Sequence, residues 1–332
     1  IAKSDKWPIT KSAVQSSSFL YDQRHLSIRG QKEVAIMRIR AELVHAAFDF
    51  FSHKGFTLIN APTMVQSACE GGSTLFELDY FGKTAYLTQS AQLYEEAAIE
   101  AFEKVFIFQP AFRAEKSKTT KHLTEFWMIE AERAFADYED NMDLQEELLH
   151  SICERVGENR RQELSIVNSK FRPPSRPFPR LTYTKARDLA SGLGFDFAFG
   201  QDPTTEAERA LSLHHDCPFF ITEYPLSARS FYHMTKKDDV TTLSSDLIAP
   251  AGYGEIATGG QRTHDYDTLV RRLKNQDIDS RSFDWYLDLR RYGVPPHSGF
   301  GLGIERTVRW ICGLEHIRAT SLFPRTISRI SP

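Results

Sequence analysis

The segment that decides the fold lies near the C-terminus and reads His297-Ser-Gly-Phe-Gly-Leu-Gly-Ile-Glu-Arg306. Its three alternating glycines, Gly299, Gly301 and Gly303, predict a strand with little side-chain bulk on one face, where a planar ligand could approach the backbone. The spacing is not the dinucleotide fingerprint GxGxxG, because Ile304 stands where the third glycine is needed. Taken alone, the segment is also compatible with a glycine-rich strand end that carries an exposed salt bridge.

A second informative segment is Phe112-Arg-Ala-Glu115, followed by a basic loop and then by His122-Leu-Thr-Glu-Phe126. The order predicts strand, turn and strand, with Arg113 and Glu115 at the end of the first strand. An arginine fork suits bidentate contact with a phosphate. Short FRxE sequences are nevertheless common, and a surface position is the more frequent outcome for such a segment alone.

A third segment, Asp246-Leu-Ile-Ala-Pro-Ala-Gly-Tyr-Gly-Glu255, places two carboxylates on either side of a turn, and Thr258 and Arg262 follow it. Carboxylates at this separation can hold Mg²⁺ beside substrate phosphates. Each of them alone is more often an ordinary surface charge.

Upstream of these segments, residues 31–51 carry apolar residues at spacings of three and four, which predicts a helix. One stripe consists of Val34, Met37, Ala41, Val44, Phe48 and Phe51, and a second of Ile36, Leu43 and Phe50. A helix that is apolar on two sides is usually covered on two sides, here by its own core and by either another part of the chain or a second subunit. Gly55 is placed to end the helix, and residues 56–60 form a short strand before Pro62.

The hydrophobic pattern of the remaining chain predicts adjacent strands mixed with helices, which favours an antiparallel α+β sheet over regular βαβ repeats. Strands are expected at 86–87, 105–108, 124–129, 218–224, 229–234 and 254–258, helices at 92–102, 140–165 and 265–275, and a strand–helix unit at 298–313. The proline-rich stretch 171–180 predicts an extended connector. We therefore expect a polar lead-in over 1–30 and one domain over 31–332, with a small insertion at about 170–215.

Composition excludes several classes of protein. No apolar run approaches the roughly 20 residues of a membrane helix. The net charge of −3 predicts no general affinity for nucleic acid, so RNA contacts would need a local basic patch such as Lys116, Lys118, Lys121 and His122, which could equally be a solvated loop. Four cysteines without a CxxC pair argue against a zinc site or a disulfide framework and favour a reducing cytoplasm.

Together, these segments resemble the class II aminoacyl-tRNA synthetases. FRAE with its following strand is similar to motif 2, GFGLGIER to motif 3, and the helix ending before Pro62 to motif 1, the dimer element. All three stand in the family's order and cover residues 25–332. The resemblance implies an antiparallel sheet flanked by helices, ATP as a substrate with Mg²⁺, and a homodimer formed through residues 31–62.

The resemblance also implies roles for single residues. Arg113 would bind the α-phosphate of a bent ATP and Arg306 the γ-phosphate, while Phe126 and Arg306 would sandwich the adenine. Glu115 and His122 would orient the nucleotide. Mg²⁺ would be ligated by Asp246 and Glu255 with Thr258, and the tRNA acceptor end contacted by Lys116, Lys118 and Lys121.

This set of residues implies a reaction without a protein nucleophile. The amino-acid carboxylate would attack the α-phosphorus, pyrophosphate would leave, and the tRNA 3′-hydroxyl would take the acyl group. Catalysis would then consist of positioning and charge neutralisation.

Two further segments resemble the aspartate/asparagine branch of the family. Glu70-Gly-Gly-Ser-Thr-Leu-Phe76 is similar to its mobile loop, whose acidic residue holds the substrate α-amino group. Thr88-Gln-Ser-Ala-Gln92-Leu-Tyr-Glu95 is similar to its amino-acid-binding turn, in which aspartate enzymes carry lysine at the position of Glu95.

The charge at Glu95 predicts asparagine as the substrate. A carboxylate can accept from an amide NH₂, whereas a second carboxylate at about 4 Å would be repelled by roughly 4 kcal/mol at an effective dielectric of about 20. Arg262 would donate to the amide oxygen, and Glu130 would hold Arg262 in place. The alternative is that Glu95 is merely an acid at a helix N-terminus, which the helix dipole favours.

The chain departs from the asparagine enzymes of the branch in two respects. Those enzymes carry an N-terminal OB-fold domain that reads the anticodon, and here no such domain is expected, because the first 30 residues resemble the segment that follows it. The run Ala257-Thr-Gly-Gly-Gln-Arg262 leans towards the archaeal aspartate type.

Two alternatives follow from these departures. Relatives without the OB fold make asparagine from aspartate, ATP and ammonia through aspartyl-adenylate, and Glu95 argues against this reading. A non-catalytic nucleotide-binding regulator is the other, and the intact Arg113, Glu115, Glu255 and Arg306 argue against it.

Overall fold

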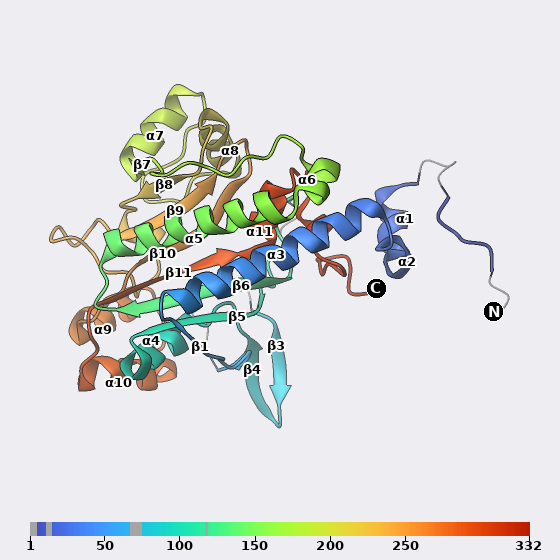
Figure 1. The fold of residues 1–332 in the computed structure, drawn as a ribbon. Coiled ribbons are helices and arrows are strands. Elements are labelled where there is room, and N and C mark those ends of the chain that lie inside the picture. The colour runs from blue at the N-terminus through green and yellow to red at the C-terminus, as the bar shows by residue number, and fades with distance from the viewer. Residues whose placement is uncertain (1–4, 11–14, 67–74, 117–118) are drawn as a thin grey trace.

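A computed structural model describes residues 5–10, 15–66, 75–116 and 119–332. Its main sheet has eight strands in the order β1-β5-β6-β11-β10-β9-β8-β7, and a three-stranded sheet has the order β2-β4-β3 (Figure 1). In the main sheet β1 pairs with β5 and β7 with β8 in parallel, and the remaining neighbours are antiparallel. The expected α+β architecture is therefore confirmed.

The described residues form the following elements. The strands are β1 (Thr57–Leu58), β2 (Met64–Val65), β3 (Glu77–Tyr80), β4 (Lys83–Leu87), β5 (Lys104–Phe112), β6 (Glu125–Ala134), β7 (Arg180–Thr182), β8 (Phe219–Thr222), β9 (Ser244–Ala249), β10 (Gly254–Gln261) and β11 (His297–Gly303). The helices are α1 (Ser17–Asp22), α2 (Arg24–Ser27), α3 (Gln31–His53), α4 (Gln92–Phe102), α5 (Tyr138–Asn159), α6 (Arg161–Val167), α7 (Tyr183–Gly192), α8 (Thr205–His214), α9 (Tyr266–Asn275), α10 (Asp284–Tyr292) and α11 (Ile304–Ile311). No helix among them is long and apolar enough to span a bilayer.

The two longest helices, α3 and α5, lie side by side across one face of the main sheet (Figure 1). The core forms between them and the sheet, where Leu43 and Phe51 of α3 are fully buried. Phe51 stacks on Phe106 of β5 with ring centroids 4.7 Å apart. Gly55, with φ of 75°, follows the end of α3 as the sequence predicts.

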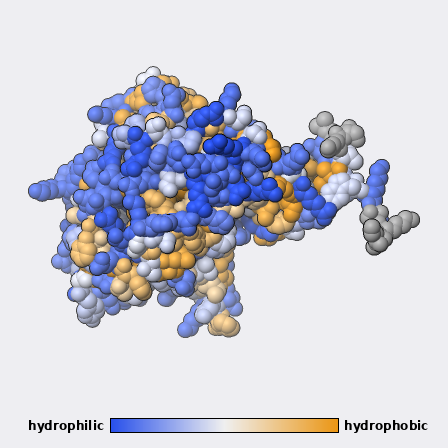
Figure 2. Space-filling model, viewed as in Figure 1, coloured by the Kyte–Doolittle hydropathy of each residue, from blue (hydrophilic) through white to orange (hydrophobic). Residues whose placement is uncertain are grey.

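The first of the two apolar stripes of α3 is only partly covered over its N-terminal half. Met37 and Val44 are half-buried and Val34 is exposed. On the face shown in Figure 2, hydrophobic residues gather beside the N-terminal part of α3 and at the tip of the β3–β4 hairpin, where Phe81 is 91% exposed. The sequence prediction that something besides the core covers this helix therefore still applies to this surface.

Several sequence predictions match the elements closely and others need correction. The helix over 92–102 and the strand–helix unit near the C-terminus are confirmed by α4 and by β11 with α11. The helix expected over 140–165 is divided at Arg160 into α5 and α6. The lead-in is not entirely without structure, because it contains α1 and α2.

The strand expected over 229–234 is wrong. Its aromatic residues suggested a strand, but Phe231 and Tyr232 are buried in a separate cluster with α9 and α10, and the backbone turns instead of joining a sheet. The expected insertion carries α7 and α8, which share a small hydrophobic cluster with β8 and β9, and its strand β7 extends the main sheet beyond β8. It is thus built onto the edge of the domain.

The packing of Phe51 generates a stability prediction. Replacing Phe51 by alanine should lower the free energy of unfolding by about 3–5 kcal/mol, because it removes a fully buried ring and leaves a cavity. Phe81→Ala is the matched control and should change it by less than about 0.5 kcal/mol. Denaturant unfolding at a fixed protein concentration measures both, and equal losses in the two variants would contradict the assignment of the core.

Candidate active site

A pocket of about 300 Å³ lies on the face of the main sheet away from α5. The alternation of β10 shows this, because Thr258 lines the pocket, whereas a Cβ on its neighbour Gly259 would meet Asn141 of α5 at 2.8 Å. Strand β6 alternates in the same way: Met128 and Glu130 line the pocket, and Ile129 between them joins the core.

Glycines of β11 make room for the floor of this pocket. A Cβ at Gly299 would lie 1.8 Å from Oε2 of Glu132, and one at Gly301 would lie 2.7 Å from Cε of Met128. Both distances are shorter than any tolerable contact, so these positions accept only glycine while the neighbouring side chains stay in place. The predicted strand with little side-chain bulk on one face is therefore present. Because Gly299 and Gly301 have no Cβ, side chains of β6 can lie across this face.

A β-bulge places Glu255 and Thr258 on the same side of β10. Residues an odd number apart normally point to opposite faces. Here Glu255 pairs with Ile248 but Ala257 with Leu247, so one extra residue is accommodated between them. Both side chains consequently line the pocket.

One end of the pocket is rich in cations. Arg113 and Arg306 both line it, together with Glu115, His122 and Phe126. Nη1 of Arg306 donates to Oε1 of Glu255 at 2.6 Å, and the guanidinium of Arg113 lies 5.7 Å from the ring centroid of Phe126. The two arginines expected from distant segments are thus brought to one cavity.

Arg306 is positioned by its neighbour Glu305, which is buried. Glu305 pairs with Arg40 of α3 at 2.7 Å and accepts from the backbone N–H of Trp127 at 2.9 Å. The start of α11 is therefore tied to both α3 and β6, and the Arg306 side chain enters the pocket from a fixed base.

The charges at this end shift the pKa values of two groups. Burial would raise the pKa of Glu255, but the guanidinium of Arg306, with Lys121 and Arg113, lowers it to about 2. Burial lowers the pKa of His122 to about 4, with Arg306 and Lys121 acting in the same direction. At neutral pH Glu255 is therefore ionised and the imidazole of His122 is uncharged.

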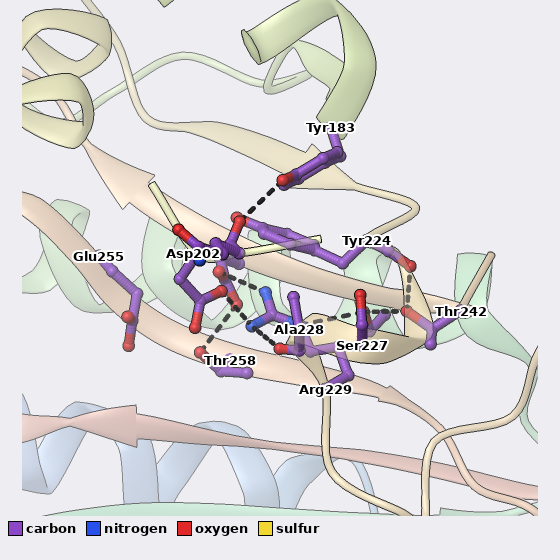
Figure 3. A network of polar contacts seen from close by, with 12 residues as sticks. Tyr183, Asp202, Tyr224, Ser227, Ala228, Arg229, Thr242, Glu255 and Thr258 are labelled. Atoms are coloured by element: carbon purple, nitrogen blue, oxygen red, sulfur yellow. Dashed lines mark hydrogen bonds and ion pairs between the residues drawn. The ribbon is translucent and has the colours of Figure 1, made fainter. Parts of the chain in front are cut away.

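Asp246, an expected metal ligand, stands behind the pocket wall and is only 6% exposed. Its Oδ2 accepts from Nη2 of Arg229 at 2.6 Å and its Oδ1 from Oγ1 of Thr258 at 2.9 Å (Figure 3). Of the three residues expected to bind Mg²⁺, Glu255 and Thr258 face the cavity directly, whereas Asp246 reaches it through Thr258 and Arg229.

The other end of the pocket combines an acceptor with a donor. Glu95 of α4 is fully buried, and its Oε1 has no hydrogen-bond partner among the described residues. Burial and the nearby carboxylates of Glu130 and Glu132 raise the pKa of Glu95 well above its usual value. Arg262 lines the same end, and Gln92 is oriented there by a hydrogen bond from its Nε2 to Glu96.

The carboxylate that holds Arg262 is Glu132, and the expectation that Glu130 would do so is wrong. Nε and Nη2 of Arg262 donate to Glu132 at 3.1 and 3.0 Å. Glu130 instead accepts from the Ser90 hydroxyl and, at 2.8 Å, from the backbone N–H of Ala91. It thereby fastens the start of α4, the helix that carries Gln92 and Glu95.

Comparisons with known proteins agree with this geometry. Residues 16–327 match the family model for tRNA synthetases class II (D, K and N). The chain belongs to this family. Among its relatives, the asparagine–tRNA ligase of Desulforamulus reducens is 51% identical over 318 residues, which span 95% of this chain and 74% of that protein. The asparagine–tRNA ligase of Sorangium cellulosum is 46% identical over 343 residues, spanning 98% and 77%.

Solved structures of class II synthetases give the same picture. The asparaginyl-tRNA synthetase of Pyrococcus horikoshii complexed with asparaginyl-adenylate matches with a TM-score of 0.94 and 44% identity, covering 98% of this chain and 76% of that one. The enzyme of Entamoeba histolytica in complex with asparaginyl-adenylate matches with a TM-score of 0.91 and 34% identity, covering 98% and 73%.

Some residues that the class II resemblance singled out lie elsewhere. Glu70 and Lys118 fall outside the described residues. Lys116 is exposed, whereas Lys121 lines the pocket and pairs with Glu208 of α8 at 2.9 Å. Of the expected basic patch, Lys121 is thus already engaged by the protein.

The structure adds residues to the class II site that the sequence did not single out. Glu132 could have been found from its spacing, because it follows Glu130 by two positions on the same strand face. Arg229, Asp202 and Glu208 carry no motif and come from the insertion and the segment after it. Only the fold brings Asp202 and Arg229 to the pocket, and Glu208 to the lining residue Lys121.

Proposed function

We propose that this protein activates asparagine with ATP to form asparaginyl-adenylate and transfers the asparaginyl group to tRNA. One observation carries the proposal. At the same end of the pocket, Oε1 of Glu95 is an acceptor without a hydrogen-bond partner among the described residues, and the guanidinium of Arg262 is a donor. A primary amide offers the complementary NH₂ donor and carbonyl acceptor. Relatives named asparagine–tRNA ligase, each matched over about three quarters of its length, support the same assignment.

The cationic end of the pocket is assigned to the triphosphate of ATP. Arg113 would bind the α-phosphate and Arg306 the γ-phosphate, while Phe126 would stack on the adenine with Arg306 on its other side. Glu115 and the uncharged His122 would orient the nucleotide by hydrogen bonds. The two guanidiniums neutralise the charge that develops on the leaving pyrophosphate.

The oxygen donors beside this end fit Mg²⁺. Among the residues that the structure describes, no three His, Cys, Asp or Glu side chains converge on one point. Mg²⁺ in nucleotide sites is commonly held by one or two carboxylates together with substrate phosphates. We assign Glu255 and Thr258, with Asp246 behind them, as the residues that would hold it, where its charge would offset that of the phosphates.

The chemistry then requires orientation rather than a protein nucleophile. A carboxylate oxygen of asparagine forms a bond to the α-phosphorus, and the bond from that phosphorus to the bridging oxygen breaks, so pyrophosphate leaves with the electron pair. A ribose hydroxyl of the tRNA end next attacks the acyl carbon, AMP leaves, and the hydroxyl proton is released. Gln92 and Glu70 are assigned to the asparagine α-amino group and Arg262 to its side-chain amide.

Selectivity against aspartate is assigned to Glu95. An aspartate side chain would bring a second carboxylate against Glu95, in a place where Glu130 and Glu132 already raise its pKa. The amide of asparagine has no charge and donates to the open oxygen. Arg262 does not reverse this preference, because Glu132 already occupies two of its donor nitrogens.

A homodimer through residues 31–62 is supported by the uncovered face of α3. An open groove of about 520 Å³ runs along this face, and the side chains of Met37, Ala41, Val44, His45, Trp127, Leu322 and Phe323 are among those that line it. Leu58 and Met64, just beyond the helix, are half exposed. A second copy of the same surface would bury these residues as the core buries the other stripe.

The deciding experiment for the proposed function is ATP–pyrophosphate exchange. We expect exchange with asparagine and at most a few per cent of that rate with aspartate, with or without ammonia. Exchange that requires aspartate would overturn the proposal, and ammonia-dependent formation of free asparagine would assign the chain to asparagine synthesis instead.

The role of Glu95 predicts a change in selectivity. Glu95→Gln removes the negative charge while keeping an acceptor, so the asparagine-to-aspartate ratio of kcat/KM should fall about 10- to 100-fold. Glu95→Lys should abolish the preference altogether. Glu100→Gln, the same change at an exposed position of α4, should leave the ratio within twofold.

The raised pKa of Glu95 adds a pH test of the same role. Protonation converts the repelling carboxylate into a carboxyl that can donate to aspartate, so the wild-type ratio should fall as the pH is lowered. A Glu95→Lys protein that still prefers asparagine, or a ratio that rises on acidification, would refute this account.

The tRNA contact of the basic loop predicts a separation of the two half-reactions. Because Lys121 is bound to Glu208, the test uses Lys116→Ala/Lys118→Ala. Aminoacylation kcat/KM should fall roughly tenfold and pyrophosphate exchange should stay within twofold, since phosphate contacts act only on tRNA. The exposed pair Lys170→Ala/Lys185→Ala is the control, and equal aminoacylation in all three proteins would mean that the loop is merely solvated.

The dimer predicts sensitivity to charge on one face of α3. Ala41→Glu puts a charge into the groove without entering the monomer core, and should shift the molecular mass in sedimentation from dimer to monomer. Lys32→Glu, on the opposite side of the helix, should stay dimeric. A wild-type protein that is monomeric at micromolar concentration would rule out this interface.

A further inference from the structure

Two arginine–carboxylate pairs lie side by side in the wall of the pocket. In one, Arg306 donates to Glu255 at 2.6 Å. In the other, Arg229 donates to Asp246 at 2.6 Å. Each joins an arginine that lines the pocket to a carboxylate beside the proposed metal site, and only the first has an assigned role.

Arg229 is held in a prepared position (Figure 3). Its guanidinium lies flat over Tyr224, 3.5 Å from the ring centroid, and its Nη1 donates to Oδ1 of Asp202 at 2.9 Å. Its side chain is only 9% exposed, whereas that of Asp202 at the rim is 62% exposed. A buried cation so fully oriented at a pocket wall resembles a binding group more than a surface salt bridge, whose contribution to stability is small.

The insertion between β7 and β8 provides the outer support for Arg229. Asp202 lies in the turn after α7, whose backbone is fastened by Tyr183. The Tyr183 hydroxyl donates to the carbonyl of Gln201 at 2.7 Å and accepts from the N–H of Gly200 at 3.1 Å. The insertion therefore fixes the carboxylate that keeps Arg229 at the edge of the cavity.

The carboxylates around Arg229 favour an anion that arrives together with a cation. Arg229 has two carboxylate partners, Asp202 and Asp246, and a third carboxylate, Glu255, is close enough to feel its charge. If Mg²⁺ accompanies a nucleotide, Asp246 and Glu255 acquire a new cationic neighbour, and both arginines can exchange a carboxylate for a phosphate oxygen. Until then, the carboxylates hold both arginines in place at the pocket wall.

We propose that Arg229 is a third phosphate-binding arginine, which contacts the β,γ-diphosphate part of ATP and the pyrophosphate that leaves. The inference rests on the proposed function and adds a residue to it. Its place beside Asp246, at the proposed metal site, points to the phosphates that the metal accompanies. The α-phosphate is already assigned to Arg113, which follows the end of β5.

Arg229→Gln tests the proposal through ligands that differ in their phosphates. The KM for ATP, and the KM for pyrophosphate in the reverse reaction, should each rise about 10- to 100-fold, the effect of losing one hydrogen-bonded charge contact. Calorimetric binding of asparaginyl-sulfamoyl-adenosine, which lacks the β- and γ-phosphates, should stay within twofold. Arg229→Lys should recover part of the loss, because it restores the charge but not the fork.

The control is Arg281→Gln, which removes an arginine that is 85% exposed and paired only with Asp279, and it should leave every value unchanged. Thermal unfolding shows whether each variant is folded. If Arg229→Gln does not fold, the same measurements with ATP, pyrophosphate and the sulfamoyl analogue are made on Arg229→Lys. A parallel loss of binding for the sulfamoyl analogue would overturn the proposal, because Arg229 would then support the whole site.

Excess Mg²⁺ separates a direct phosphate contact from support of Asp246. If raising Mg²⁺ restores the pyrophosphate KM of Arg229→Gln fully, Arg229 acts through Asp246 and the proposal fails. If the wild type shows no asparagine-dependent exchange, the proposed function fails first. Calorimetric binding of pyrophosphate with Mg²⁺ to wild type and Arg229→Gln then still decides on Arg229, with equal affinities counting against it.

Discussion

The close approach of β6 side chains to the bare face of β11 is the constraint on which the pocket depends. Glu132 crosses β11 where Gly299 has only a hydrogen atom, and from there it reaches Arg262, directly after the end of β10. Met128 uses the space over Gly301 in the same way. A methyl group at either position would displace the side chain that crosses it, and at Gly299 the displaced side chain is Glu132, the one that holds Arg262.

Charge pairing is the second constraint, and it follows from the first. The carboxylates and guanidiniums of this pocket are largely buried, and a buried charge without a partner is strongly disfavoured. Most of them are therefore paired before any ligand binds, as in Arg306 with Glu255 and Arg262 with Glu132. Glu95 differs from these pairs, because its pKa is raised and its Oε1 has no hydrogen-bond partner among the described residues.

The sequence predicted those parts of this site that depend on the spacing of residues within one segment. The glycine alternation of β11, the helix α4 and the paired segments around Arg113 and Arg306 all lie where their patterns indicated. Their convergence on one cavity needed the family resemblance, since spacing within a segment says nothing about distance between segments.

What could not be predicted depends on register between strands. Glu130 and Glu132 face the same side of β6, and only the pairing of Gly299 with Glu132 decides which of them reaches Arg262. The role of Arg229 could not be predicted for a related reason. Its segment was expected to be a strand, and its partner Asp202 comes from the insertion. In both cases the missing information is tertiary and cannot be read from local spacing.

The β-bulge in β10 divides the β9–β10 hairpin into two halves. In each half, the strand register sets independently which side chains face the pocket. The half next to the turn, where Gly254 pairs with Ala249, sets the direction of Glu255, while the half beyond the bulge sets that of Thr258. Adding or deleting a residue between Pro250 and Tyr253 would therefore re-aim the acid without rotating the rest of the strand. The direction of Glu255 can in this way change during evolution independently of Thr258 and the residues beyond the bulge.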